Sequence, residues 1–197
     1  MTETRTESRQ TARAAYLVLG MHRSGTSATA QLLAKAGAGL PEHLMPGDEH
    51  NAKGYFEPWR IANLNNLRLQ AAGSAWDDVF AFPQTPLPLA GESDWIAQGQ
   101  ALFGEEYGTT ALPLLKDPRV SVLMPFWSQV LKGLDITPRI VIPVRHPLAV
   151  AGSLAKRNGF PVEKSVLLWT SYMLAAEAYT RDLPRAFVSY DRLLGDW

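Results

Sequence analysis

The sequence predicts an α/β fold, a three-layer sandwich with a mostly parallel central sheet. Short apolar runs rich in β-forming residues alternate with longer stretches whose apolar residues recur at helical spacing. The first run, residues 16–19, leads through a glycine-containing turn straight into such a helical stretch. Strands that are separated by helices pair in parallel, and ligands bind beyond the carboxyl ends of such strands.

The first half of the chain contains one expected strand, two helices and two long irregular segments. The strand at 16–19 ends at Gly20, and a helix runs from Thr26 to about 36, with hydroxyls at 26 and 27 available as caps. Residues 37–57 are rich in Gly, Pro and polar side chains, which predicts a long functional loop. A second helix starts at 57–58, because Pro58 suits the first turn, and continues to about 72. Residues 73–91 form the second irregular segment.

The second half of the chain repeats the alternation of helix and strand. Ser93 is expected to cap a helix that continues through 102. A short strand at 112–115 is weakened by Pro113, and a helix then spans 122–130. The mainly apolar strand at 139–144 precedes a helix that ends near 156. The longest helix spans 162–180, and a last strand occupies 186–190.

Composition limits the classes of protein that this chain can represent. Its 197 residues are 46% hydrophobic and 19% charged, as in a single globular domain. The formal net charge of zero argues against a general nucleic-acid binder, and no apolar run approaches the ~18 residues of a membrane span. Without cysteine there are no disulfides, which fits a reducing, cytoplasmic setting. Residues 1–14 are polar and are expected to be a disordered lead-in to one domain over 15–197.

The turn after the first strand predicts an anion site. Its sequence is Gly20-Met21-His22-Arg23-Ser24-Gly25-Thr26-Ser27. A loop between a strand and a helix directs backbone N–H groups and a helix N-terminus at one point, which favours a bound phosphate. The turn nearly matches the triphosphate-binding pattern GxxxxGK[ST], but Thr26 occupies the Lys position and the cation, Arg23, comes three residues earlier.

Three features argue against an ATP or GTP hydrolase. The Lys of the triphosphate loop is missing, and the strand at 139–144 ends in Arg145 instead of a magnesium-binding Asp. The carboxylates of Asp117 and Asp191 lie beside cations that can neutralise them. The sequence therefore favours a nucleotide whose charge is met by protein groups alone, without a metal.

Polar side chains follow four of the expected strands. These groups are His22-Arg23-Ser24, Lys116-Asp117, Arg145-His146 and Tyr190-Asp191. Because the carboxyl ends of parallel strands meet at one edge of a sheet, basic residues are expected to gather there on an otherwise neutral protein.

In these motifs, from Tyr16 to Leu194, the chain resembles the sulfotransferases that use 3′-phosphoadenylyl sulfate (PAPS). Residues 23–27 resemble the 5′-phosphosulfate loop of that family, in which a basic residue precedes Ser-Gly-Thr. Arg145 and Ser153 keep the eight-residue interval of the family's 3′-phosphate motif. Residues 190–191 resemble an aromatic–acidic pair near the adenine, and residues 116–118 resemble the Lys-Asp-Pro of the tyrosylprotein branch, whose lysine faces the sulfuryl oxygens.

The resemblance implies in-line transfer of a sulfuryl group from PAPS to an acceptor hydroxyl or amine, with no metal. The implied cofactor-binding residues are His22, Arg23, Ser24, Gly25, Thr26, Ser27, Arg145, Ser153 and Tyr190. Arg23 and Lys116 would stabilise the charge that develops during transfer. Glu57 is the expected base, because the acidic residue of related enzymes lies between these two motifs. His50, Asp77 and His22 are the alternative bases.

The acceptor is left open among a glycan, a lipid headgroup, a peptide tyrosine and a small phenol. Loops 37–56 and 73–92 are expected to form its pocket, with Trp59 and residues 76–78 as candidate lining residues. Lys156 and Arg157 are interpreted as a solvated helix end. The chain stops before the Arg-Lys-Gly segment that covers the 3′-phosphate in cytosolic members, which predicts a C-terminally short domain or a branch without that segment. The oligomeric state is not predicted.

Two other functions stay open on the sequence alone. One is a P-loop kinase or NTPase with a relocated cation, and the other is a nucleotide-binding module that has lost catalysis. Metal-dependent binding of ATP would identify the first, and sulfate transfer from labelled PAPS that is lost in Arg23→Ala and Lys116→Ala would exclude the second.

Overall fold

The fold is α/β, with a four-stranded parallel sheet between two layers of helices. The computed structural model describes residues 13–47, 49, 54–81 and 88–195. The strands are β1 (Arg13–Val18), β2 (Leu114–Lys116), β3 (Ile136–Val144) and β4 (Arg185–Ser189), in the order β2-β1-β3-β4. All three pairings are parallel, and Tyr16 of β1 lies opposite both Leu114 and Arg139. The predicted fold class is therefore confirmed.

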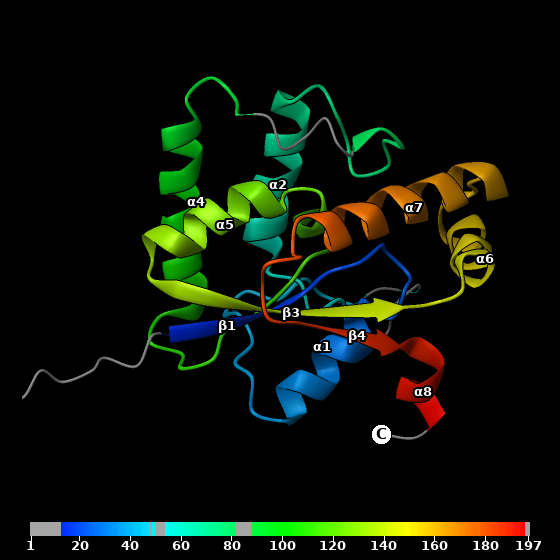
Figure 1. Cartoon of the computed structure of the whole chain (residues 1–197), viewed down its shortest axis with the longest axis horizontal. Coiled ribbons are helices and arrows are strands. Elements are labelled where there is room, and N and C mark those ends of the chain that lie inside the picture. Colours follow the sequence, from blue (N-terminus) through cyan, green and yellow to red (C-terminus); the bar gives the residue numbers. More distant parts are fainter. Residues whose placement is uncertain (1–12, 48, 50–53, 82–87, 196–197) are drawn as a thin grey trace, which may run out of the picture.

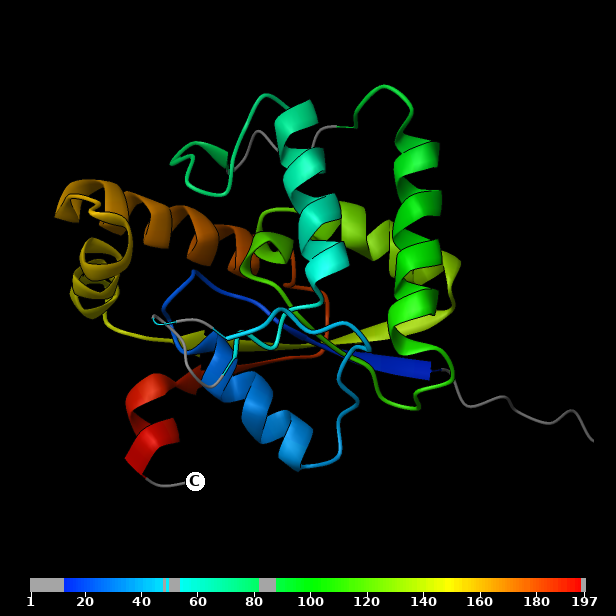
Figure 2. The same ribbon diagram turned by 180° about the vertical axis from the view of Figure 1, so that it is seen from behind.

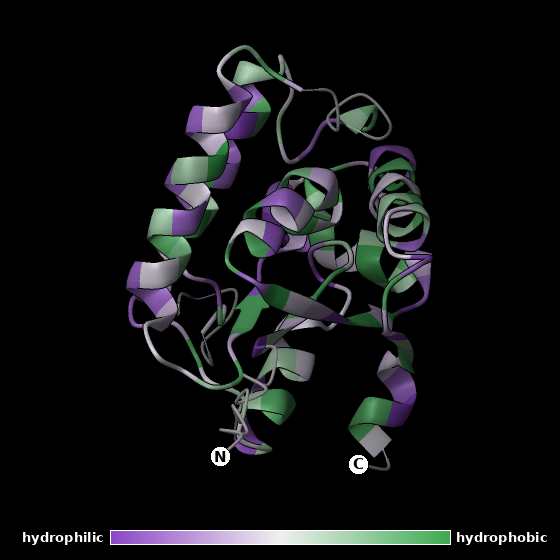
Figure 3. Ribbon diagram, turned by 60° about the vertical axis from the view of Figure 1, so that its left-hand side comes forward, coloured by the Kyte–Doolittle hydropathy of each residue, from purple (hydrophilic) through white to green (hydrophobic). Residues whose placement is uncertain are grey.

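The helices cover the two faces of the sheet unequally. They are α1 (Thr26–Lys35), α2 (Trp59–Ala71), α4 (Glu92–Tyr107), the 3-10 helix η1 (Pro118–Ser121), α5 (Met124–Gly133), α6 (Pro147–Asn158), α7 (Val162–Ala178) and α8 (Tyr190–Gly195). Helices α1 and α8 lie on one face of the sheet, whereas α2, α4, α5 and α7 lie on the other (Figures 1 and 2). Figure 3 shows hydrophilic and hydrophobic residues alternating along the outer helices, as expected where one side of a helix is buried.

Two hydrophobic clusters correspond to these two layers. The larger cluster packs the thick helical layer against β1 and β3 and includes the fully buried Trp127 and Tyr172. The smaller cluster joins Val18 and Leu114 of the sheet to Ala30 of α1. None of the helices that the structure describes is both long and apolar enough to cross a bilayer.

Most of the expected elements are present, but several begin elsewhere. Strand β1 starts at Arg13, inside the expected lead-in, whose first twelve residues lie outside the described part of the chain. Pro58 is the N-cap of α2, one position before its predicted place in the first turn. The capping prediction for Ser93 is wrong, because Gly91, at φ +70°, adopts the left-handed conformation and starts the helix two residues earlier.

The region after β2 also differs from the prediction. The strand predicted at 112–115 begins only after Pro113, and the helix predicted through 122–130 is preceded by η1. The side chain of Asp117 accepts a hydrogen bond from the backbone N–H of Arg119 and so caps this short turn. Tyr190, expected as the last strand residue, is the first residue of α8.

Candidate active site

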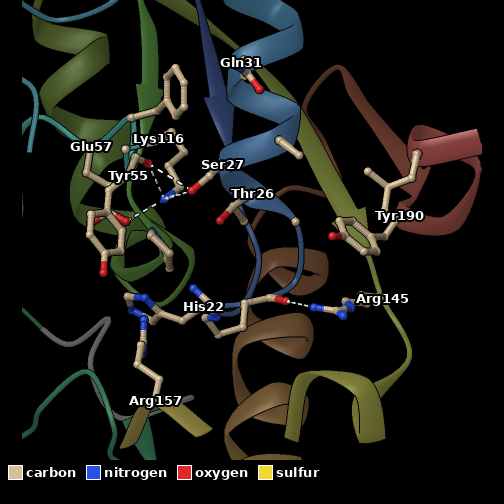
Figure 4. A pocket seen from close by; sticks show the side chains of 17 residues that line it. His22, Thr26, Ser27, Gln31, Tyr55, Glu57, Lys116, Arg145, Arg157 and Tyr190 are labelled. Atoms are coloured by element: carbon tan, nitrogen blue, oxygen red, sulfur yellow. Dashed lines mark hydrogen bonds and ion pairs between the residues drawn. The ribbon is translucent and has the colours of Figure 1, made fainter. Parts of the chain in front are cut away.

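The carboxyl ends of the strands surround a pocket of about 330 Å³. The loop between β1 and α1 forms one wall, and residues 54–57 with Lys116 form another. Arg145, which follows β3, and Tyr190, which follows β4, complete the far side (Figure 4). The volume lies in the range of small-molecule sites, at the edge of the sheet where α/β folds bind ligands.

The loop between β1 and α1 has a backbone that few sequences can adopt. Arg23 has φ +70° and Gly25 has φ +95°, so both lie in the left-handed region. A Cβ atom at Gly25 would overlap the ring of Tyr190, so the position admits only glycine on two independent grounds. A left-handed conformation at a non-glycine residue such as Arg23 is uncommon and is concentrated at functional sites.

The N-terminus of α1 opens toward the pocket without a side-chain cap. The prediction that the hydroxyls of Thr26 and Ser27 cap this helix is wrong, because the N-cap position is occupied by Gly25. Ser27 Oγ instead donates to the carbonyl oxygen of Tyr55 at 3.2 Å. The first-turn N–H groups of a helix have no partner within the helix, so the positive end of α1 favours an anion in this pocket.

Arg145 and Ser153 come together around Arg23, on two elements that are distant from it in sequence. Arg23 Nε donates to Ser153 Oγ at 2.8 Å, and Arg145 Nη1 donates to the carbonyl oxygen of Arg23 at 2.9 Å. The guanidinium of Arg145 also stacks on Tyr190, 4.7 Å from the ring centroid. The segment from Arg145 to Ser153 includes the start of α6 and holds the loop from one side. Arg145 lies on the pocket wall, and Ser153 contacts Arg23.

Lys116 lies at the centre of a buried network on the opposite side of the loop. Its Nζ donates to Glu57 Oε1 at 2.6 Å, to the carbonyl oxygen of Tyr55 at 2.9 Å and to Ser27 Oγ at 3.3 Å (Figure 4). The side chains of Lys116 and Glu57 are only 2% and 3% exposed. The other oxygen of Glu57 accepts from Arg119 Nη2 at 3.0 Å, so both carboxylate oxygens are held by cations.

A second layer of buried polar contacts holds Arg119. Arg119 Nε donates to Asp117, whose Oδ2 also accepts from Asn65 Nδ2 at 2.7 Å. The Nε1 atom of Trp127 donates to Asn65 Oδ1 at 2.9 Å and closes the network. Burial opposes the charge of Arg119, but the carboxylates of Asp117 and Glu57 outweigh it, so the pKa of Arg119 is raised.

A second pocket, of about 360 Å³, adjoins the first. The two pockets share His22, Tyr55, Glu57 and Arg157, and Trp76 lies on the wall of the second. Burial, followed by the charges of Arg119 and other nearby cations, lowers the pKa of His22 well below its ordinary value. Because the two pockets share these lining residues, a molecule in the second pocket would lie beside a molecule in the first.

Most of the residues singled out from the sequence line the first pocket. These are His22, Arg23, Gly25, Thr26, Ser27, Glu57, Lys116, Arg145 and Tyr190. Ser24 is fully buried in the loop, and Ser153 acts on the site through Arg23. Asp77 pairs with Lys164 at 2.7 Å and lines neither pocket, and Trp59 is 49% exposed away from both. His50 lies outside the described residues.

Two functional candidates were missed by sequence reasoning. Arg157 is not a solvated helix end, because the last turn of α6 places its guanidinium 5.5 Å from the ring of Trp76 and on the walls of both pockets. Arg119 directly follows Lys116-Asp117-Pro118, but only the 3-10 turn brings it back to Glu57. Its proximity to a strand-end Lys-Asp pair was the available signal.

Neither a scan against protein-family models nor a search of curated proteins found a match to this chain. Within the described ranges, no group of three or more His, Asp or Glu side chains is arranged to hold a metal ion. The assignment of function below therefore rests on the geometry of the pocket and on the sequence motifs that form it.

Proposed function

We propose that this chain is a sulfotransferase that moves the sulfuryl group of PAPS to an acceptor hydroxyl or amine. The main support is that cations from three strand ends, Arg23, Lys116 and Arg145, converge on one pocket at the uncapped N-terminus of α1. The site thus offers protein charge and backbone N–H groups at several points, as a nucleotide with two separate anionic ends requires.

The two ends of the nucleotide would lie on the two sides of the loop. The 5′-phosphosulfate fits between the start of α1 and Lys116, since the first-turn N–H groups of α1 and the positive charge of Lys116 both favour an anion there. The 3′-phosphate fits beside Arg145, and the adenine beside Tyr190, on whose ring Arg145 stacks. Ser153 would hold Arg23 in position through its hydrogen bond to Nε.

The transfer itself needs alignment and charge stabilisation more than covalent help from the protein. The acceptor would approach from the second pocket, which shares His22, Tyr55, Glu57 and Arg157 with the first. Arg23 and Lys116 would stabilise the equatorial sulfonate oxygens and the leaving phosphate, as argued for related phosphoryl transfers. The aromatic wall at Trp76 suits an acceptor with a flat apolar face, such as a sugar or a phenol.

Calorimetric binding of 3′-phosphoadenosine 5′-phosphate in EDTA tests this function. We expect binding without a metal, and much weaker binding of ATP with magnesium. Arg145→Ala should weaken binding at least roughly 10-fold, because a charge-assisted phosphate contact contributes about 1.5–3 kcal/mol. Arg139→Ala is the matched control, since this arginine lies on the same strand, is exposed and is not on the pocket wall.

Each outcome of this titration decides between the proposal and its rivals. Tight, magnesium-dependent binding of ATP without binding of the desulfated cofactor would instead identify an NTPase-like protein. Equal effects of the Arg145 and Arg139 variants would refute the placement of the 3′-phosphate.

A further inference from the structure

His22 carries a polar atom that is buried at the boundary between the two pockets. The residue is 8% exposed, it lines both pockets, and its Nε2 atom has no hydrogen-bond partner among the described residues. Buried polar atoms are nearly always paired, because leaving one unpaired is costly. An unpaired imidazole nitrogen at this position indicates that a ligand group supplies the missing partner.

Aromatic packing fixes the orientation of the His22 ring. The ring of Trp76 meets it edge-on at a centroid distance of 4.8 Å, and Tyr172 meets it edge-on at 6.1 Å. The hydroxyl of Tyr172 donates to the carbonyl oxygen of Trp76 at 2.7 Å and so joins the two supports. The imidazole is therefore held by packing on α7 and the 73–81 segment, which leaves its Nε2 available for a ligand.

Burial and the surrounding charges together keep the imidazole of His22 neutral. Four cations surround it from four elements: Arg23 of the loop, Lys116 of β2, Arg119 of η1 and Arg157 of α6. The carboxylate of Glu57 lies on the same pocket wall, and Figure 4 shows His22 between Glu57 and Arg157. Burial first, and then the four cations, hold the pKa of His22 well below its usual range, so the ring is neutral at neutral pH and Nε2 can carry a free lone pair.

Glu57, the base expected from the sequence, is in a different situation. Lys116 holds one of its carboxylate oxygens at 2.6 Å, and Arg119 holds the other at 3.0 Å. A proton on either oxygen would disrupt a buried ion pair. The geometry suits Glu57 to holding these two cations against the site rather than to accepting a proton from an acceptor.

We propose that His22 is the general base of the transfer and that Glu57 is a positioning residue for Lys116 and Arg119. This inference rests on the proposed sulfotransferase function. The acceptor oxygen forms a bond to sulfur while the bond from sulfur to the 5′-phosphate oxygen breaks, and that electron pair leaves with 3′-phosphoadenosine 5′-phosphate. The acceptor proton passes to Nε2 of His22 and then to solvent, which requires the tautomer with its first proton on Nδ1.

Occupancy of the first pocket would prepare this base. The negative charges of the nucleotide offset the cations that disfavour protonation of His22, so the bound cofactor raises the pKa of the imidazole toward its ordinary value. The ring becomes a stronger base only when the sulfuryl donor is present. Catalysis and cofactor binding are thereby coupled through one side chain.

An NMR titration of the full chain tests the inference without knowledge of the acceptor. The imidazole signals are assigned with His22→Gln and with His43→Gln, a matched control whose side chain is 43% exposed. We expect the pKa of His22 to rise by about one unit or more on binding 3′-phosphoadenosine 5′-phosphate. A pKa of His22 that does not move in the complex would overturn the proposal.

Single-turnover hydrolysis of labelled PAPS, with water as acceptor, provides the second measurement. At saturating PAPS, His22→Gln should lose roughly 100-fold or more in rate, together with the acid limb of the pH profile. Glu57→Gln should keep that limb, and its loss there instead would overturn the proposal. If wild-type hydrolysis is below detection, the NMR result decides alone. Failure of the wild type to bind the nucleotide would refute the proposed function itself.

Discussion

Replacing Glu57 with Gln preserves the size of the side chain and removes its charge from between two buried cations. Lys116 Nζ and Arg119 Nη2 lie 2.6 and 3.0 Å from its two oxygens. Removing one partner of a buried ion pair costs about 3–5 kcal/mol, because the remaining charge stays out of water without compensation. The Gln amide can still accept one hydrogen bond, so we expect about 3 kcal/mol. For a chain of this size that lowers the melting temperature by roughly 6–12 °C.

Differential scanning calorimetry at pH 7 measures this shift, and Glu105→Gln provides the matched control. Glu105 pairs with Arg60 at the same distance, 2.6 Å, but the side chains are 54% and 32% exposed. An exposed pair contributes about 0–1 kcal/mol, so the control should melt within about 4 °C of wild type. If both variants melt within 2 °C of each other, on the order of the control's own shift, the reasoning from burial is refuted.

Two further predictions concern the loop and pH. In urea unfolding, Gly25→Ala should destabilise the protein by about 1–3 kcal/mol more than Gly37→Ala. Both glycines have strongly positive φ, but of the two only Gly25 lies against another group, the ring of Tyr190. Equal losses of stability would show that the ring does not constrain the loop. The folded-state pKa of His22 is below its unfolded value of about 6.5, so the unfolded state binds more protons below that pH. The free energy of unfolding should therefore decrease as the pH is lowered, by up to ~1.4 kcal/mol per pH unit from this group. His22→Gln should flatten the fall between pH ~7 and ~5; a slope identical to that of wild type would contradict the buried, neutral His22.

The fold could be predicted because its determinants are local. The apolar runs around Leu17 and Ile142 are strands in which both of these side chains are fully buried, and the helical spacing after Thr26 and Val162 gives α1 and α7 with starts correct to the residue. The predicted helix boundaries were wrong where the backbone conformation of one residue determines the start of the helix. Gly91 adopts the left-handed conformation and displaces Ser93 as the cap of α4, which the polar character of Ser93 cannot reveal.

The part of the candidate site that follows from the parallel pairing of the strands could be predicted from the sequence. Parallel pairing of β2, β1 and β3 brings Lys116, Arg23 and Arg145 to one edge, as the sequence indicates. Partnership between side chains was not predictable. The position of Arg119 beside the strand-end Lys-Asp pair marks it as a candidate, but its contact with Glu57, like the contact of Arg157 with Trp76, depends on where separate elements pack.

Helix α8 has a consequence for the dynamics of the molecule. It is six residues long and none of them is buried, so a helix of this kind opens locally at little cost. Its first residue, Tyr190, nevertheless lies against the loop glycine and under Arg145, and Tyr190 and Leu194 both line the first pocket. A ligand in the first pocket would contact α8, which few other packing contacts stabilise. The amide hydrogen-exchange rates of α8 should therefore decrease in proportion to the fraction of the pocket that is occupied. Amide exchange in α8 therefore reports ligand binding at the loop between β1 and α1.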